Sequence, residues 1–114
     1  MRCTGFSPIE EAKVSEKPWF QEASSEAGKA FLHFNRDVTS KSTLDEKTAE
    51  LIKLATSSVL RCQHCTELHI RKALEVGASR QEVADALLIA ALQGAGTQLY
   101  WNKEGFEELL SDEA

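Results

Sequence analysis

The apolar residues of this chain recur at the three- and four-residue spacing of helices, and no segment alternates as strands do. This spacing predicts a helical region over 9–37, in which Pro18 is the candidate for a break. Its apolar residues would form one buried stripe, consisting of Trp19, Ala23, Ala27, Ala30, Phe31 and Phe34. Residues 1–8 are expected to be a loose tail, and the polar stretch 38–43 a turn.

Capping signals divide the rest of the chain. The segments 43–46 and 79–82 have the Thr-x-x-Glu and Ser-x-x-Glu forms of a capping box, which predict two helix starts. Gly77 is placed as the left-handed residue that follows a helix. The helices expected from these signals cover 45–60, 63–76, 81–101 and 103–110. We therefore predict an all-α fold, with a single domain over 9–114 and its core over about 44–101.

The segment 83–92 is apolar around nearly its whole circumference. A helix of this kind must be buried on most sides. A chain of 114 residues has too little material to wrap one helix completely. We therefore expect neighbouring subunits to cover part of it, in a homo-oligomer.

Composition and charge narrow the classes of partner. Thirteen Lys and Arg against eighteen Asp and Glu give a net charge of −5, which would repel nucleic acid. No apolar run approaches the ~18 residues of a membrane span. The first residues lack the apolar region of a secretory signal, and three cysteines do not indicate an extracellular disulfide scaffold. The expectation is a soluble, cytoplasmic domain with no nucleic-acid or membrane partner.

The segment with the clearest chemistry contains Cys62 and Cys65, three residues apart at the start of an expected helix. The free N–H groups of a first helical turn and the helix dipole stabilise a thiolate. They can lower the pKa of a thiol by several units from about 8.5. The same spacing lets one sulfur attack the other and close a disulfide.

Helical geometry places a histidine beside this pair. At about 100° per residue, Cys65 and His69 each lie within roughly 60° of Cys62, whereas His64 lies about 160° away. The imidazole of His69 could therefore take a proton from sulfur or return it.

Glu50 is expected to approach His69 from the preceding helix. If helices 45–60 and 63–76 form an antiparallel hairpin that turns near Arg61, position 50 lies opposite roughly 69–72. A carboxylate with the apolar neighbours Ala49, Leu51 and Leu54 would be partly removed from water, as proton-relay groups often are.

The pattern Glu50-x11-Cys62-x2-Cys65-x3-His69 resembles the signature of the alkylhydroperoxidase D-like branch of the carboxymuconolactone decarboxylase superfamily. The likeness extends over about 44–101 and includes the break at 77–79. It implies an all-α bundle, usually assembled as a trimer or hexamer.

The resemblance also implies site roles. In a peroxidase or disulfide reductase of this kind, Cys65 would be the thiolate that attacks peroxide, and Cys62 would resolve it. Glu50 and His69 would relay protons, and His64 is often counted in the site. No bound cofactor is implied. The partners would be a peroxide or disulfide substrate and an external dithiol carrier as reductant.

Other interpretations stay open. The two cysteines could be structural thiols, or Cys62, Cys65, His69 and Glu50 could hold zinc, although structural zinc sites usually combine two separate clusters. Haem attachment is excluded because Thr66 follows Cys65. A carboxymuconolactone-type decarboxylase would need acid–base groups but no dithiol. A non-catalytic redox-sensing module would cycle without turnover. His33 and Cys3 are expected to have no role.

Overall fold

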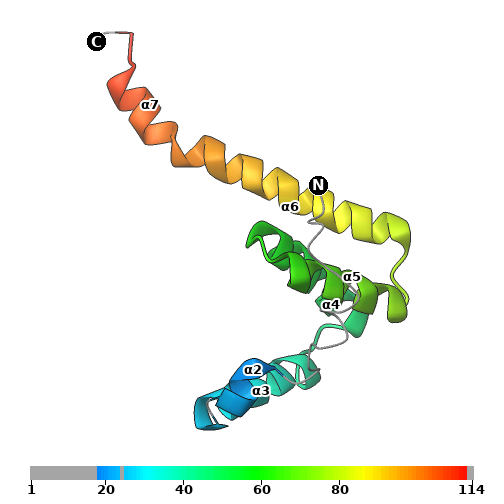
Figure 1. The fold of residues 1–114 in the computed structure, drawn as a ribbon. Helices are drawn as coiled ribbons and strands as arrows, with labels where there is room; N and C mark the ends of the chain where they lie inside the picture. The colour runs from blue at the N-terminus through cyan, green and yellow to red at the C-terminus, as the bar shows by residue number, and fades with distance from the viewer. Residues whose placement is uncertain (1–17, 24, 113–114) are drawn as a thin grey trace, which may run out of the picture. The chain divides into compact units, whose positions relative to one another are not determined.

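The computed structural model describes residues 18–23 and 25–112, and it is all-α in this part, as predicted (Figure 1). The helices are α2 (Trp19–Ala23), α3 (Ser25–Ser40), α4 (Glu46–Val59), α5 (Gln63–Glu75), α6 (Arg80–Trp101) and α7 (Lys103–Leu109). The expected tail over 1–8 and the start of the expected helical region, 9–17, lie outside the described residues. The chain divides into two compact units, 1–42 and 43–114. The single domain over 9–114 stays a prediction.

In the first unit, α2 and α3 pack against each other at a glycine. Phe20 makes edge contacts with Trp19 and Phe31, at ring-centroid distances of 5.7 and 5.3 Å. Gly28 is buried at this crossing, and a Cβ there would collide with the carbonyl oxygen of Phe20. The close approach of the two helices therefore depends on the missing side chain.

Two expectations for this unit are wrong. The apolar stripe is not buried, since Trp19 is 76% exposed and Phe31 and Phe34 are also exposed. A stripe is buried only when another layer covers it, and the described part of this unit has only two helices. The stretch 38–43 is also not wholly a turn, because α3 continues to Ser40. Its polar residues include no glycine or proline that would stop a helix.

The start of α4 differs from the expected capping box at 43–46. Asp45 is the N-cap, and its Oδ1 accepts the N–H of Thr48 at 2.7 Å. This main-chain hydrogen bond holds the pKa of Asp45 below its usual 3.8. A charged acceptor makes the stronger cap, so the helix begins two residues after the position that Thr43 would set.

The second expected capping box is confirmed and links two helices. Ser79 Oγ accepts the N–H of Glu82 at 3.0 Å, and Glu82 Oε1 accepts the N–H of Ser79 at 2.9 Å. The other carboxylate oxygen of Glu82 accepts Lys47 Nζ of α4 at 2.9 Å. The start of α6 is thereby tied to α4 as well as capped.

The core of the second unit is formed by α4, α5 and the first half of α6. Its buried residues are Leu54, Ala73, Ala78 and Val83, flanked by Leu51, Ile70, Ala86 and Leu87. Beyond Ala90, which is buried, α6 runs past the other two helices toward α7 (Figure 1). The large apolar residues exposed along α6 are Leu88, Ile89, Leu92, Leu99, Tyr100 and Trp101. In the single chain, this helix is therefore not buried on most sides.

None of the helices in the described part of the chain is both long enough and apolar enough to span a membrane.

Replacing Leu54 by alanine should lower the free energy of unfolding by about 2–5 kcal/mol, because its side chain is fully buried among three helices and leaves a cavity. Ile52→Ala on the same helix is the control, since Ile52 is 49% exposed, and it should cost much less. Urea titration of the full chain measures both. Equal losses would place the core elsewhere.

Candidate active site

The connection between α4 and α5 is a single tight turn that positions the thiols. Leu60 caps α4, the N–H of Arg61 bonds to Ser58 O at 3.1 Å, and the N–H of Cys62 bonds to Ser57 O at 3.0 Å. These two bonds form a Schellman motif. Cys62 is at once the last residue of this motif and the N-cap of α5. The hairpin predicted to turn near Arg61 is confirmed, and it fixes where the first sulfur lies.

Arg61 holds an unusual backbone conformation in this turn. Its φ is +63°, and among the described residues no other non-glycine has a positive φ. The turn between α5 and α6 uses the same pair of bonds, from Gly77 to Leu74 and from Ala78 to Ala73, but its left-handed residue is Gly77 at φ +99°. The expected role of Gly77 is confirmed. The α4–α5 turn, by contrast, carries strain that glycine would avoid.

Arg61→Gly should raise the free energy of unfolding by about 0.5–1 kcal/mol. A left-handed non-glycine residue costs roughly 1–2 kcal/mol, and the greater freedom of glycine in the unfolded chain cancels about 0.5–1 kcal/mol of the gain. Arg61→Ala keeps a Cβ and serves as the control, with no gain expected. If both variants are stabilised equally in thermal unfolding, the charge of Arg61 and not its backbone is the cause.

Cys62 and Cys65 are free, half-buried thiols in direct interaction. The main-chain N–H of Cys65 donates to Cys62 Sγ at 3.2 Å. A hydrogen bond between the two thiols, together with the main-chain N–H groups of Cys65 and His64, lowers the pKa of Cys62. The same thiol bond, together with partial burial, raises the pKa of Cys65.

Glu50 and His69 meet as the hairpin predicted. His69 Nδ1 lies 2.7 Å from Glu50 Oε1, and Glu50 is buried, at 8% exposure. An ionised carboxylate can only accept, so Nδ1 carries the hydrogen, and in the neutral form of the imidazole the lone pair is on Nε2. His69 follows Cys65 by four residues on α5, and such residues are neighbours on a helix surface. The imidazole is thus oriented by a buried carboxylate one turn beyond the second thiol.

Comparison with models of known protein families identifies the family of this chain. The carboxymuconolactone decarboxylase family model matches residues 25–101, well over half of the chain. This chain belongs to the carboxymuconolactone decarboxylase family. The resemblance in the sequence is thereby confirmed.

Two known proteins are similar to this chain. "Uncharacterized protein 4 in cox locus" of Paracoccus denitrificans is 34% identical over 67 residues, which are 59% of this chain. The match spans 60% of the length of that curated relative. A protein of Methanobacterium thermoautotrophicum with a crystal structure is 36% identical, with a TM-score of 0.72. That likeness covers 76% of this chain and 95% of the other, so the two share a fold.

Lys53 and Thr66 are site residues of this family member that the sequence analysis missed. Lys53 Nζ lies 3.4 Å from Glu50 Oε2, the oxygen that His69 does not use. Thr66 Oγ1 donates to the carbonyl of Cys62 at 2.8 Å. The Glu-x-x-Lys spacing on one helix could have indicated the first contact. The second follows from the turn geometry and has no signal in the sequence.

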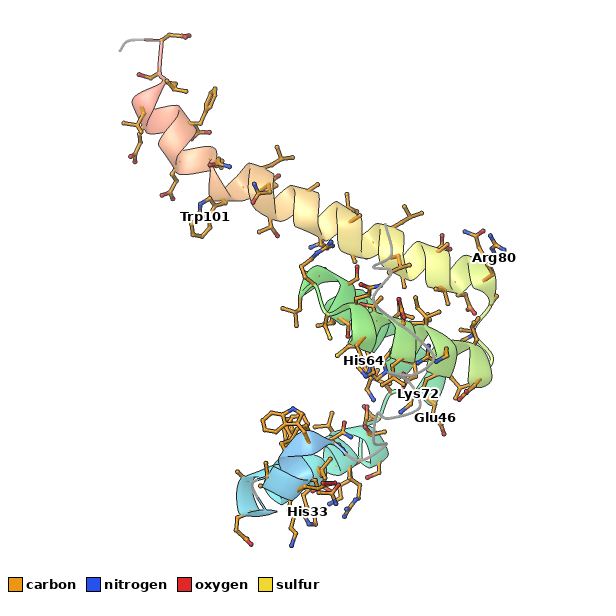
Figure 2. The ribbon with its side chains drawn as sticks, in the orientation of Figure 1. His33, Glu46, His64, Lys72, Arg80 and Trp101 are labelled. Atoms are coloured by element: carbon orange, nitrogen blue, oxygen red, sulfur yellow. The ribbon has the colours of Figure 1, made fainter. Side chains whose placement is uncertain are left out.

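The remaining candidates lie apart from the relay. The His64 side chain is exposed on α5, where Figure 2 labels it, and only its main-chain N–H acts on Cys62. A catalytic role for its imidazole stays a prediction. His33 is exposed on α3, with Arg36 Nη1 3.5 Å from its Nδ1. Cys3 lies outside the described residues.

The described residues were also examined for groups of metal ligands and for hollows. Within 18–23 and 25–112, no three His, Cys, Asp or Glu side chains gather as metal ligands. A hollow of about 540 Å³ lies instead where α6 meets α7, lined by residues between 98 and 107. None of the thiol-site residues lines it.

Proposed function

We propose that this family member is a thiol oxidoreductase that reduces a peroxide, or a disulfide, with Cys62 and Cys65. The observation that carries the proposal is a pair of free thiols at a helix N-terminus, with a buried Glu50–His69 hydrogen bond one turn away. The first feature makes a thiolate available. The second supplies a group that can move protons at sulfur.

The reaction balances with these groups alone and an external dithiol. One thiolate attacks the terminal oxygen of a hydroperoxide, the O–O bond breaks, and the alkoxide leaves as the alcohol after taking a proton. The attacking sulfur becomes a sulfenic acid. The second sulfur loses its proton, attacks the first, and displaces hydroxide, which leaves as water. A dithiol carrier then reduces the Cys62–Cys65 disulfide by exchange and is itself oxidised.

A second candidate is suggested by the family's name. Decarboxylation of a muconolactone-type acid would use acid–base groups, and Glu50 with His69 could serve as such a pair. That reaction does not require the two free thiols. A non-catalytic redox-sensing module is a third possibility, in which the thiols cycle without turnover.

Turnover assays of the wild-type chain separate the three functions. A peroxidase should consume tert-butyl or cumene hydroperoxide continuously with dithiothreitol present. A decarboxylase should release carbon dioxide from a muconolactone-type acid without any reductant. A sensor should cycle between thiol and disulfide but show no steady consumption of peroxide. Either of the last two results overturns the proposal.

The proposed reductant follows from the thiol chemistry, and the proposed assembly follows from the exposed apolar residues of α6. We propose a dithiol carrier protein as reductant, the cytoplasm as the reducing location, and a trimer or hexamer of this chain. The exposed apolar residues of α6 continue to Trp101, which is 83% exposed and is labelled at the end of that helix in Figure 2. Large apolar side chains exposed in this number on one helix are typical of an interface.

Leu92→Lys should reduce the molar mass of the particle from that of an oligomer toward that of one chain, because a charge cannot be buried unpaired between helices. Gln93→Lys adds the same charge at an exposed polar neighbour and is the control. Light scattering on a sizing column measures both. A monomeric wild type would contradict the proposed assembly.

A further inference from the structure

The carboxylate of Glu50 is shared between two helices. Its Oε1 lies 2.7 Å from Nδ1 of His69 on α5, and its Oε2 lies 3.4 Å from Nζ of Lys53 on α4. All three side chains are largely removed from water, with exposed fractions of 11% for Glu50, 18% for His69 and 28% for Lys53. The three residues therefore form a mostly buried cluster in which both carboxylate oxygens have a nitrogen partner.

Burial makes the total charge of this cluster matter. An ionised carboxylate that has lost its water is stable only when a positive charge or several hydrogen bonds compensate for it. Two groups of the cluster can carry that positive charge, the ammonium of Lys53 and the imidazolium of His69. One of them is enough to balance a single carboxylate. If both were charged, the cluster would hold an excess positive charge away from water.

The two possibilities have opposite consequences for His69. A neutral imidazole that donates its Nδ1–H to Glu50 keeps a lone pair on Nε2 and can accept a proton there. An imidazolium donates from both nitrogens and can accept no proton. A lysine is the better carrier of a permanent charge, because an ordinary lysine keeps its proton to about pH 10, whereas an ordinary histidine loses it near pH 6.5.

We propose that Lys53 is a positioning residue whose ammonium balances Glu50, so that His69 stays neutral and able to accept a proton. This inference rests on the proposed function, in which His69 moves protons during the thiol chemistry. Lys53 acts through Glu50 and touches no reacting atom. Its ammonium holds Oε2 and leaves Oε1 to the imidazole, and it offsets the negative charge that would otherwise draw a second proton onto the ring.

Nitrogen NMR of the reduced full chain observes the ring directly, because a ring nitrogen with a lone pair and one with a hydrogen differ widely in chemical shift. The signals of His69 are those that disappear in His69→Gln. Lys53→Gln keeps a hydrogen-bond donor for Glu50 and removes only the charge. At neutral pH, this variant should raise the ratio of imidazolium to neutral imidazole at His69 by at least about tenfold, the usual effect of one neighbouring charge.

Three further variants separate charge from structure. Lys53→Met should raise the ratio as Lys53→Gln does, and Lys53→Arg, which keeps the charge, should restore the wild-type ratio. Lys47→Met is the matched control, because Lys47 lies on the same helix but pairs with Glu82 Oε2 at 2.9 Å. It should leave the ring signals unchanged. A wild-type ratio in folded Lys53→Gln or Lys53→Met, or an equal rise in Lys47→Met, would overturn the proposal.

The inference and the proposed function fail separately, since the NMR measurement needs no peroxide. A ring that gains a proton in Lys53→Gln, in a chain whose wild type does not consume hydroperoxide, removes the peroxidase function and keeps the role of Lys53. Wild-type turnover together with a ring that does not respond to Lys53→Gln keeps the function and removes the role of Lys53.

Discussion

Cys62→Ser should abolish hydroperoxide turnover, by at least ~100-fold, and leave the stability of the chain nearly unchanged. Loss of either thiol of the pair removes the route through the Cys62–Cys65 disulfide. The fold should tolerate the change because serine is among the best N-cap residues, and its hydroxyl can accept the Cys65 N–H in place of sulfur. Consumption of cumene hydroperoxide with dithiothreitol and thermal unfolding are measured on the same sample.

Cys3→Ser is the matched control, since it removes the third cysteine of the sequence with the same chemical change. It should leave turnover at the wild-type rate. A Cys62→Ser variant that keeps its activity would mean that the thiol pair takes no part in the reaction. A large loss of stability would mean that the sulfur at the N-cap is structural.

Glu50→Gln should lower turnover by about 100-fold, the usual size of a general acid–base contribution. The amide keeps the volume of the buried side chain but removes the charge that holds His69 Nδ1–H and Lys53. The imidazole then loses its fixed orientation and its preference for a lone pair on Nε2. Steady-state turnover as a function of pH measures the effect, and the profile should flatten as the rate falls.

Glu75→Gln on α5 changes an exposed carboxylate in the same way and should have no effect. Thermal unfolding of both variants separates a relay from a purely structural role of Glu50, because a relay group can be replaced by its amide without unfolding the site. If Glu50→Gln lowers the unfolding temperature strongly together with turnover, the carboxylate holds the site and does not act as a proton relay.

The sequence predicted those parts of the fold that depend on local signals. Gly77 and the Ser79–Glu82 box set the boundaries of α5 and α6 through hydrogen bonds between near neighbours, and both are found as expected. At the start of α4, both Thr43 and Asp45 could serve as the N-cap. The sequence pattern alone does not show that the carboxylate of Asp45 is the group that caps the helix. Burial of the 19–34 stripe depends on what lies over it, which periodicity does not contain.

The sequence predicted the part of the candidate site that depends on the spacing of residues along the helices. The Glu50–His69 contact follows from the register of a helical hairpin, so counting along the chain found it. The distinction between the two thiols depends on which sulfur caps the helix, and the strain at Arg61 depends on a turn that uses an arginine where glycine is usual. Neither feature has a periodic pattern in the sequence, and both emerge only from the backbone hydrogen bonds of the turn.

The redox state of peptide 62–71 after one equivalent of cumene hydroperoxide, followed in time against turnover, tests the central claim most directly. If the two sulfurs carry the reaction, this peptide becomes lighter by two hydrogen atoms at least as fast as the enzyme turns over, and dithiothreitol restores it. Peroxide consumption while both sulfurs stay reduced, or a disulfide that forms more slowly than one turnover, would contradict it.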